Sequence, residues 1–201
     1  MSITNYSELQ TSVANWLHRS DLTAQIPDFI AIAESALSRD LDCKEMETKT
    51  TLTTTSGSAT VALPVDLVET RRLMVTGTYN TVLKYLTPDE LAQDYGDNST
   101  GLPCVFTVIG GALELAKIPD SAYTMELTYR QQIPALSDAS TTNWLLTRWP
   151  DAYLYGALLA AQPYIIGDAR LPVFEKKYAD AINGINGIDW YSGTTMRVKS
   201  R

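Results

Sequence analysis

The chain has 201 residues, of which 45% are hydrophobic and 19% charged, so it is long and apolar enough to bury a core without metal or disulfide staples. A net charge of −7 argues against free binding to nucleic acid, which needs clustered Lys and Arg. The first residues do not resemble a signal peptide, and no apolar stretch is long enough to span a bilayer, so we expect no membrane contact.

Two amphipathic helices are predicted within residues 1–47. Apolar residues that include Leu9, Val13 and Trp16 recur at helical spacing over residues 6–18, and a second apolar stripe covers residues 25–43. Ser20 and Asp21 interrupt the pattern between them. This arrangement is typical of an antiparallel helical hairpin.

Residues 48–136 have the pattern of a β-rich subdomain with six or seven strands. We expect one hairpin around residues 56–58, a second over residues 71–86 and a third that turns at residues 110–111. Residues 123–131 alternate as a further strand. Thr87, Pro88 and Glu90 form the pattern of a capping box, which predicts a short helix.

Helices are expected again over residues 137–187. Residues 149–166 are richly apolar, and Pro163 should kink or end that helix. A last helix should start at Leu171 or Pro172 and end before the arm. The segregated order of helices, strands and helices predicts an α+β fold. We expect an antiparallel α-helical bundle built from the N- and C-terminal helix pairs, a β-rich insert subdomain, and an extended C-terminal arm of residues 188–201.

No residue pattern in the chain points to catalysis, a cofactor or a metal. His18, the single histidine, lies at a predicted helix end without a nucleophile motif. Gly110 and Gly111 lack the rest of a phosphate-binding loop. Cys43 and Cys104 are isolated, as expected of reduced thiols. We therefore expect no enzyme, no cofactor and no metal site.

Two local clusters each have a structural and an interface interpretation. Arg71 and Arg72 are expected at a strand edge, where one of them pairs with an acid or meets a neighbouring subunit. Aromatic residues such as Trp144 and Trp149 gather where the chain returns to the helices, and they pack in the core or meet a partner.

The last fourteen residues have no periodicity of their own and differ from the rest in charge. Three basic residues and one acidic residue give residues 188–201 a charge of +2, which leaves −9 on residues 1–187. Most chain ends are frayed and carry no function. This segment also has aromatic and apolar side chains, and when extended it reaches on the order of 45 Å. We interpret it as an arm that orders on another subunit.

Several stretches, in order and over nearly the whole chain, resemble the head-to-tail adaptor (connector) proteins of short-tailed phages. They are residues 6–9 (YSEL), 16–22 (WLHRSDL), 26–30 (IPDFI) with Ala33 and Glu34, 37–41 (LSRDL), 63–67 (LPVDL) with Glu69 and Arg72, 87–91 (TPDEL), 150–158 (PDAYLYGAL), and 168–171 (DARL) before Tyr178. These are packing and capping motifs, so their order and spacing carry the resemblance.

The resemblance implies a virion protein of the neck or tail, assembled in the host cytoplasm. Such adaptors form a homo-oligomeric ring, typically of twelve subunits, beneath the portal protein; they extend the channel through which genomic DNA passes without specific binding, and they form a platform for tail nozzle or tail-fibre proteins. The family has no catalytic residues to transfer. Carried to this chain, the resemblance assigns portal binding to residues of the arm: Trp190, Tyr191, Met196, Arg197, Val198 and Lys199. Arg71 and Arg72 remain candidates for a contact between subunits.

Two other interpretations are compatible with the sequence. A tail-completion or neck protein that does not touch the portal would share the same fold signals. A small hydrolase, which belongs to a different class, would need a concave site with convergent polar groups.

Overall fold

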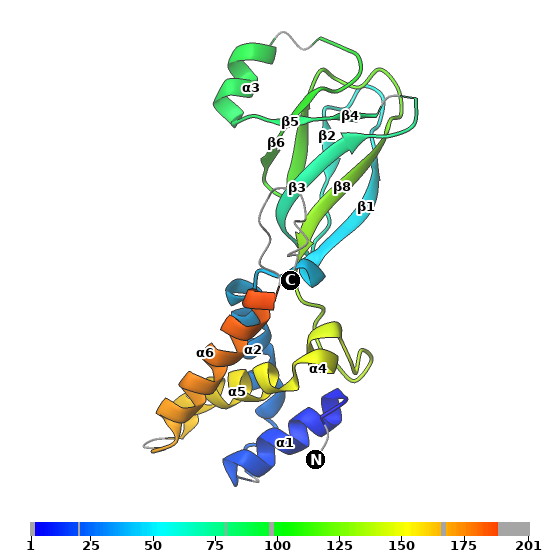
Figure 1. Cartoon of the computed structure of the whole chain (residues 1–201). Coiled ribbons are helices and arrows are strands. Elements are labelled where there is room, and N and C mark those ends of the chain that lie inside the picture. Colours follow the sequence, from blue (N-terminus) through cyan, green and yellow to red (C-terminus); the bar gives the residue numbers. More distant parts are fainter. Residues whose placement is uncertain (1–2, 20, 79, 97–98, 166–167, 189–201) are drawn as a thin grey trace, which may run out of the picture. The chain divides into compact units, whose positions relative to one another are not determined.

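The computed structural model describes residues 3–19, 21–78, 80–96, 99–165 and 168–188 (Figure 1). The chain divides into two compact units. The helical unit is drawn from residues 1–45 and 133–201, and the β unit consists of residues 46–132.

A single helix, α5, organises the helical unit. The α-helices described in this unit are α1 (Tyr6–Leu17), α2 (Ile26–Asp40), α4 (Trp144–Arg148), α5 (Pro150–Ala160) and α6 (Leu171–Ile188). Helix α5 contacts each of the other four and lies between α2 and α6 (Figure 1). Its apolar side chains point in all directions, and a helix with that pattern is buried on all sides. Tyr153, Ala157 and Leu158 are accordingly inaccessible to solvent.

Small residues allow α2, α5 and α6 to approach closely. A Cβ atom added to Gly156 of α5 would lie 3.2 Å from Cβ of Ala33 on α2 and 3.3 Å from a ring carbon of Tyr178 on α6. Both distances are shorter than ordinary contacts between carbon atoms. Gly156 therefore sets the spacing of the three helices.

The prediction of an antiparallel helical bundle with a β insert is wrong. Helix α1 packs mainly against α5 and has few contacts with α2, so the first two helices do not form the expected hairpin. The physical reason is that α5 is apolar on all sides and has α1 as one of its neighbours. His18 ends α1 in the left-handed region with φ of 52°, a common way for a helix to end. Apart from one short helix over Pro88–Tyr95, which lies among the strands, the α-helices and the strands occupy separate stretches of the chain, and the fold is α+β.

Two four-stranded sheets form the β unit within the described residues, and they include a hairpin within residues 71–86 and one that turns at residues 110–111, as predicted. The first sheet has the order β1 (Glu47–Thr53), β8 (Thr124–Gln131), β3 (Leu67–Val75) and β4 (Thr81–Val82). The second has the order β2 (Thr60–Ala62), β7 (Ala112–Ala116), β6 (Val105–Ile109) and β5 (Lys84–Tyr85). All pairs are antiparallel except β5 with β6.

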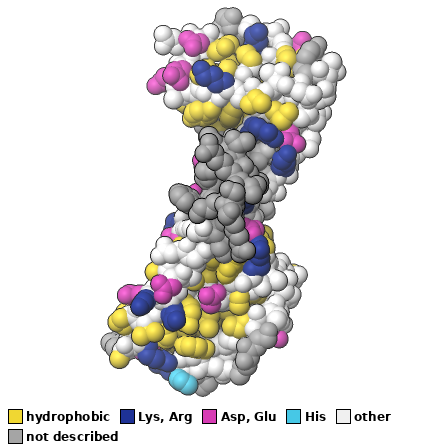
Figure 2. All heavy atoms as spheres, viewed as in Figure 1, with side chains coloured by type: hydrophobic (Ala, Val, Ile, Leu, Met, Phe, Trp, Pro, Cys, Tyr) yellow, Lys and Arg dark blue, Asp and Glu magenta, His cyan; other side chains and the backbone are white. Residues whose placement is uncertain are grey.

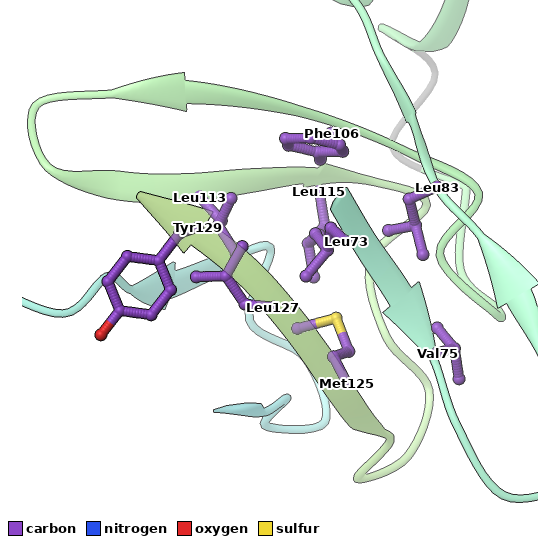
Figure 3. Close-up of a cluster of buried hydrophobic side chains, with 9 residues drawn as sticks. All are labelled: Leu73, Val75, Leu83, Phe106, Leu113, Leu115, Met125, Leu127 and Tyr129. Atoms are coloured by element: carbon purple, nitrogen blue, oxygen red, sulfur yellow. The ribbon is translucent and has the colours of Figure 1, made fainter. Parts of the chain in front are cut away.

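Both sheets contribute to one hydrophobic core (Figure 3). In β8 every second side chain, from Met125 through Leu127 to Tyr129, is buried, as expected for a strand with one face on the core. These side chains meet buried residues of the second sheet, among them Phe106 and Leu113. The core therefore joins strands that are far apart in sequence.

The structure confirms some local predictions for this unit and contradicts another. Gly110 and Gly111 make the turn between β6 and β7 with φ of 59° and 79°, which glycine adopts without strain. Helix α3 (Pro88–Tyr95) begins with the predicted capping box of Thr87 and Glu90. The hairpin expected around residues 56–58 does not form, because β1 pairs with β8 and β2 pairs with β7.

Candidate protein-interaction surfaces

The residues considered for catalysis lie apart from one another and from any recognisable site. His18 is exposed at the end of α1, where it is the cyan side chain of Figure 2. Cys43 is buried, and Cys104 is half-buried. Among the described residues, no group of three or more His, Cys, Asp or Glu side chains is arranged to hold a metal ion. None of the described helices has the length and apolar character needed to cross a membrane.

Arg71 and Arg72 lie on β3 and form ion pairs with acids of the same sheet. Arg72 lies 2.8 Å from Glu126, which also pairs with Lys49 at 3.1 Å. The ammonium of Lys49, together with Arg72, holds the pKa of Glu126 below its usual range. Arg71 approaches Glu47 at 3.7 Å and Glu69 at 3.4 Å. The expected pairing with acids is present, and all of these groups are on the surface, where such pairs contribute at most about 1 kcal/mol.

An apolar groove opens beside these arginines, along the free side of β3. Strand β3 pairs with β8 on one side, while β4 covers only Met74 and Val75 on the other. The groove has a volume of about 550 Å³ and lies between residues 67–73 of β3 and side chains near β4, β5 and β6. Val68, Val82 and Tyr85 line it and are 46–58% exposed. Figure 2 shows hydrophobic side chains gathered on the face of the β unit.

On the helical unit, a second surface is built around Trp16. The indole is 41% exposed and meets the rings of Tyr155 and Phe174 edge-on at 6.1 Å. Arg170 donates to the backbone oxygen of Trp16 at 3.0 Å and stacks over Phe174 at 5.4 Å. A carboxylate, Asp168, holds the same guanidinium, and this contact lowers the pKa of that carboxyl. Trp16 is therefore a rigid exposed aromatic anchor of the kind enriched in protein interfaces.

The sequence predicts Trp16 as one of the apolar residues at helical spacing in the first helix, and no residue pattern predicts its exposure or the groove beside β3. Helical spacing cannot distinguish a residue at the edge of a stripe from one at its centre. The register shifts of β3 next to Val68 and Arg71 are not visible in the sequence either. Exposed apolar and aromatic side chains on both units are thus a finding of the structure.

The aromatic cluster at the return to the helices has a mixed environment. Trp144 and Trp149 are half-buried and meet edge-on at 6.2 Å, with Arg148 stacked 4.9 Å over the second ring. Arg148 also forms an ion pair with Glu45. Tyr153, in contrast, is fully buried. Trp149 continues into a shallow groove between α5 and α6 that Asp151, Lys177, Asp180 and Gly184 also line.

A buried polar cluster surrounds Tyr153. Its hydroxyl accepts from Nδ2 of Asn143 at 2.6 Å and donates to Oε1 of Glu34 at 3.2 Å. The same Oε1 accepts from the backbone N–H of Leu136 at 2.7 Å, and Nδ2 of Asn143 donates to the carbonyl of Pro134. Burial raises the pKa of Glu34, and the hydrogen bonds from Leu136 and Tyr153 oppose that effect. The cluster fastens residues 134–143 to α2 and α5.

The six arm residues assigned to portal binding, Trp190, Tyr191, Met196, Arg197, Val198 and Lys199, lie outside the described residues. The described residues include exposed apolar or aromatic side chains on both units, at the groove beside β3 and around Trp16. Surfaces of this kind mark proteins that contact other proteins.

Comparison with protein families identifies the family of this chain. The chain matches the SU10 adaptor protein family over residues 4–199, nearly its whole length, and it belongs to that family. The resemblance to phage head-to-tail adaptors is confirmed, and the protein is a structural adaptor and virion component of a bacteriophage. A comparison with curated proteins found no match.

Proposed function

We propose that this adaptor forms a ring of twelve copies beneath the phage portal, extends the DNA channel, and offers a platform to which tail nozzle or tail-fibre proteins attach. Assembly takes place in the host cytoplasm. The observation that carries the proposal is the family match, because it continues through residues 190–199 and so includes the arm.

Charge supports the division of roles within the chain. Residues 188–201 carry a charge of +2 and residues 1–187 carry −9. The arm therefore favours acidic partner surfaces, whereas the rest of the chain repels them. A net charge of −7 per copy also suits a channel wall along which DNA slides without binding, since phosphates are repelled. The ring requires heterologous contacts that close by rotation, and exposed apolar surfaces on both units are available for them.

The arm residues Trp190, Tyr191, Met196, Arg197, Val198 and Lys199 are proposed as the portal contact. Such an arm gives each subunit a second point of attachment, which raises the effective concentration of the first contact. Arg71 and Arg72 are proposed to lie near a neighbouring subunit, where their existing ion pairs with acids fix the side chains in place.

The test is electron microscopy of the purified protein mixed with its cognate portal. We expect a coaxial twelve-fold ring below the portal with the full chain, and none after deletion of residues 188–201. Trp190→Ala with Tyr191→Ala should weaken ring formation, whereas Thr194→Ala with Thr195→Ala is a matched control within the same segment and should not. Circular dichroism of the truncated protein must show that it still folds.

Two results would overturn the proposal. A full-length protein that never associates with the portal would indicate a neck or tail-completion protein further from the head. An activity that disappears in His18→Asn would indicate a hydrolase. Asparagine is the suitable replacement because it tolerates the left-handed backbone of His18.

A further inference from the structure

The C-terminal end of α2 is capped by a residue of α6 that lies 146 positions further along the chain. Nδ2 of Asn186 donates to the carbonyl of Asp40 at 3.0 Å, and Oδ1 of Asn186 accepts from the N–H of Asp42 at 2.9 Å. One side-chain amide thus joins two backbone groups at a helix end, where carbonyls lack partners within the helix. The Tyr178 hydroxyl reinforces the contact by donating to the Asp40 carboxylate at 2.9 Å.

The capped residues lead directly into the first connection to the β unit. The chain passes from Asp40, the last residue of α2, through residues 41–45 to β1. Within the helical unit, Asn186 holds the start of this connection and Arg148 pairs with Glu45 at its end. The last turn of α6 therefore helps to position the segment from which the β unit begins.

Asn186 belongs to the turn of α6 with the weakest helical preference, because Gly184 and Gly187 flank it. A glycine in a helix interior, such as Gly184, makes the helical state about four- to five-fold less favourable than alanine does. Gly187 is the penultimate residue of α6, so this interior value does not apply to it. Neither glycine is needed for space, since an added Cβ would meet nothing within 4 Å at either position. Neither has the positive φ that would require glycine. Their physical effect is to lower the helical preference of this turn, which is also held by the buried side chain of Ile185.

We propose that the last turn of α6 is a latch. When the turn is helical, Asn186 holds the end of α2 and the connection of residues 41–45; when the turn opens, the connection is released. Residues 189–201 continue from this turn, so a partner that holds them also holds the latch closed. Binding of the arm and closure of the latch are then coupled, and the coupling is reciprocal.

Hydrogen exchange of the Asp42 amide in the full-length protein, followed by NMR, tests the latch without any partner. Gly184→Ala should slow this exchange about four- to five-fold, and Gly187→Ala should slow it by less, because both favour the helical turn but only Gly184 lies in the helix interior. The amide of Phe29, which bonds to Gln25 in the first turn of α2, serves as the reference and should not change.

A matched pair of asparagines separates the latch from general helix stability. Asn183 is exposed on the same helix, and Asn183→Ala improves helix propensity as much as Asn186→Ala does. We expect Asn183→Ala to slow exchange at Asp42 or leave it unchanged, and Asn186→Ala to accelerate it. The latch would be overturned if Asn183→Ala and Asn186→Ala changed the exchange rate of the Asp42 amide in the same direction. It would also be overturned if the glycine substitutions left that rate unchanged.

The coupling to a partner rests on the proposed function. Addition of the portal should slow Asp42 exchange in the full-length protein and have no such effect in Asn186→Ala. A portal that binds the full chain while Asp42 exchange stays constant refutes the coupling. A portal that does not bind at all refutes the proposed function, whereas the glycine and asparagine variants still decide whether the latch exists.

Discussion

Tyr153→Phe is the sharpest probe of the buried polar cluster. The substitution removes one oxygen atom from a side chain that is inaccessible to solvent and leaves the ring in place. Asn143 loses an acceptor at 2.6 Å, and Glu34 loses a donor at 3.2 Å. Water cannot replace either contact without entering the interface of α2 and α5.

The expected loss of stability follows from these two contacts. A hydrogen bond to a charged group contributes about 1.5–3 kcal/mol, and one between neutral groups about 0.5–1.5 kcal/mol. Glu34 keeps its bond from Leu136, and Asn143 keeps its bond to Pro134, so neither partner is left without any hydrogen bond. We therefore expect the free energy of unfolding of the helical unit to fall by about 2–4 kcal/mol. Urea titration followed by tryptophan fluorescence measures it, because the described tryptophans, Trp16, Trp144 and Trp149, belong to that unit.

Tyr164→Phe is the matched control. Its ring packs against Phe29, but 56% of the residue is exposed, so loss of its hydroxyl should change stability by less than about 0.5 kcal/mol. If Tyr153→Phe is as harmless as this control, the cluster is hydrated and the desolvation argument fails. Combining Tyr153→Phe with Glu34→Gln in a double-mutant cycle isolates the energy of the Tyr153–Glu34 contact.

Three further substitutions follow from the same structure. Glu34→Gln should gain stability relative to the unmodified chain as the pH rises from 4 to 7. Burial raises the pKa of Glu34 above its ordinary 4.5, so the native carboxyl stabilises the fold when protonated and loses that advantage as the pH rises through its folded pKa. A difference in unfolding free energy between the two proteins that does not change with pH in urea unfolding would contradict this. Gly156→Ala should destabilise the helical unit by about 1–2 kcal/mol through its clash with Ala33, whereas Gly184→Ala should stabilise it or leave it unchanged. If thermal unfolding shows that both substitutions shift the melting temperature in the same direction, the packing argument is refuted. Thr87→Ala should weaken α3 by about 1 kcal/mol, visible as faster amide exchange in that helix without a large change in the melting temperature, because α3 buries no side chain.

Features determined by neighbouring residues could be predicted from the sequence. The capping box at Thr87 needs only residues 87–90, and the turn at Gly110 and Gly111 needs only the conformational freedom of glycine. Pro163 ends the apolar helix early for a similarly local reason: α5 stops at Ala160 and is followed by a 3₁₀ turn over Gln162–Tyr164.

The long-range pairings of β1 and β3 with β8, and of β2 with β7, could not be predicted, because the partners are far apart in the chain. Residues 47–62 contain two strands separated by a turn-rich segment, and that pattern alone favours a hairpin. In the structure β8 lies between β1 and β3, and the alternating buried side chains Met125, Leu127 and Tyr129 make it the better partner for both. A strand with one strongly apolar face takes the central place in a sheet, and the polar β1 is left at the edge.

The arrangement of the helices was missed for a related reason. The sequence shows that residues 150–160 are apolar. Because these apolar residues are spread evenly about the helix axis, α5 has to be surrounded by other elements. One central helix is incompatible with two equivalent hairpins packed side by side. Helix α1 packs mainly against α5, which no periodicity in the first 20 residues indicates.

Glycine shows most clearly what the structure adds to the sequence. At Gly110 and Gly111 the backbone angle requires it, and at Gly156 the neighbouring helices require it. At Gly184 and Gly187 neither requirement exists, although the helix would be more stable with alanine. The sequence shows the same letter at all five positions. The structure separates the three glycines that the fold requires from Gly184 and Gly187, which lower the helical preference of the turn that carries Asn186. For that reason we expect the adaptor to respond to its partner at the end of α6.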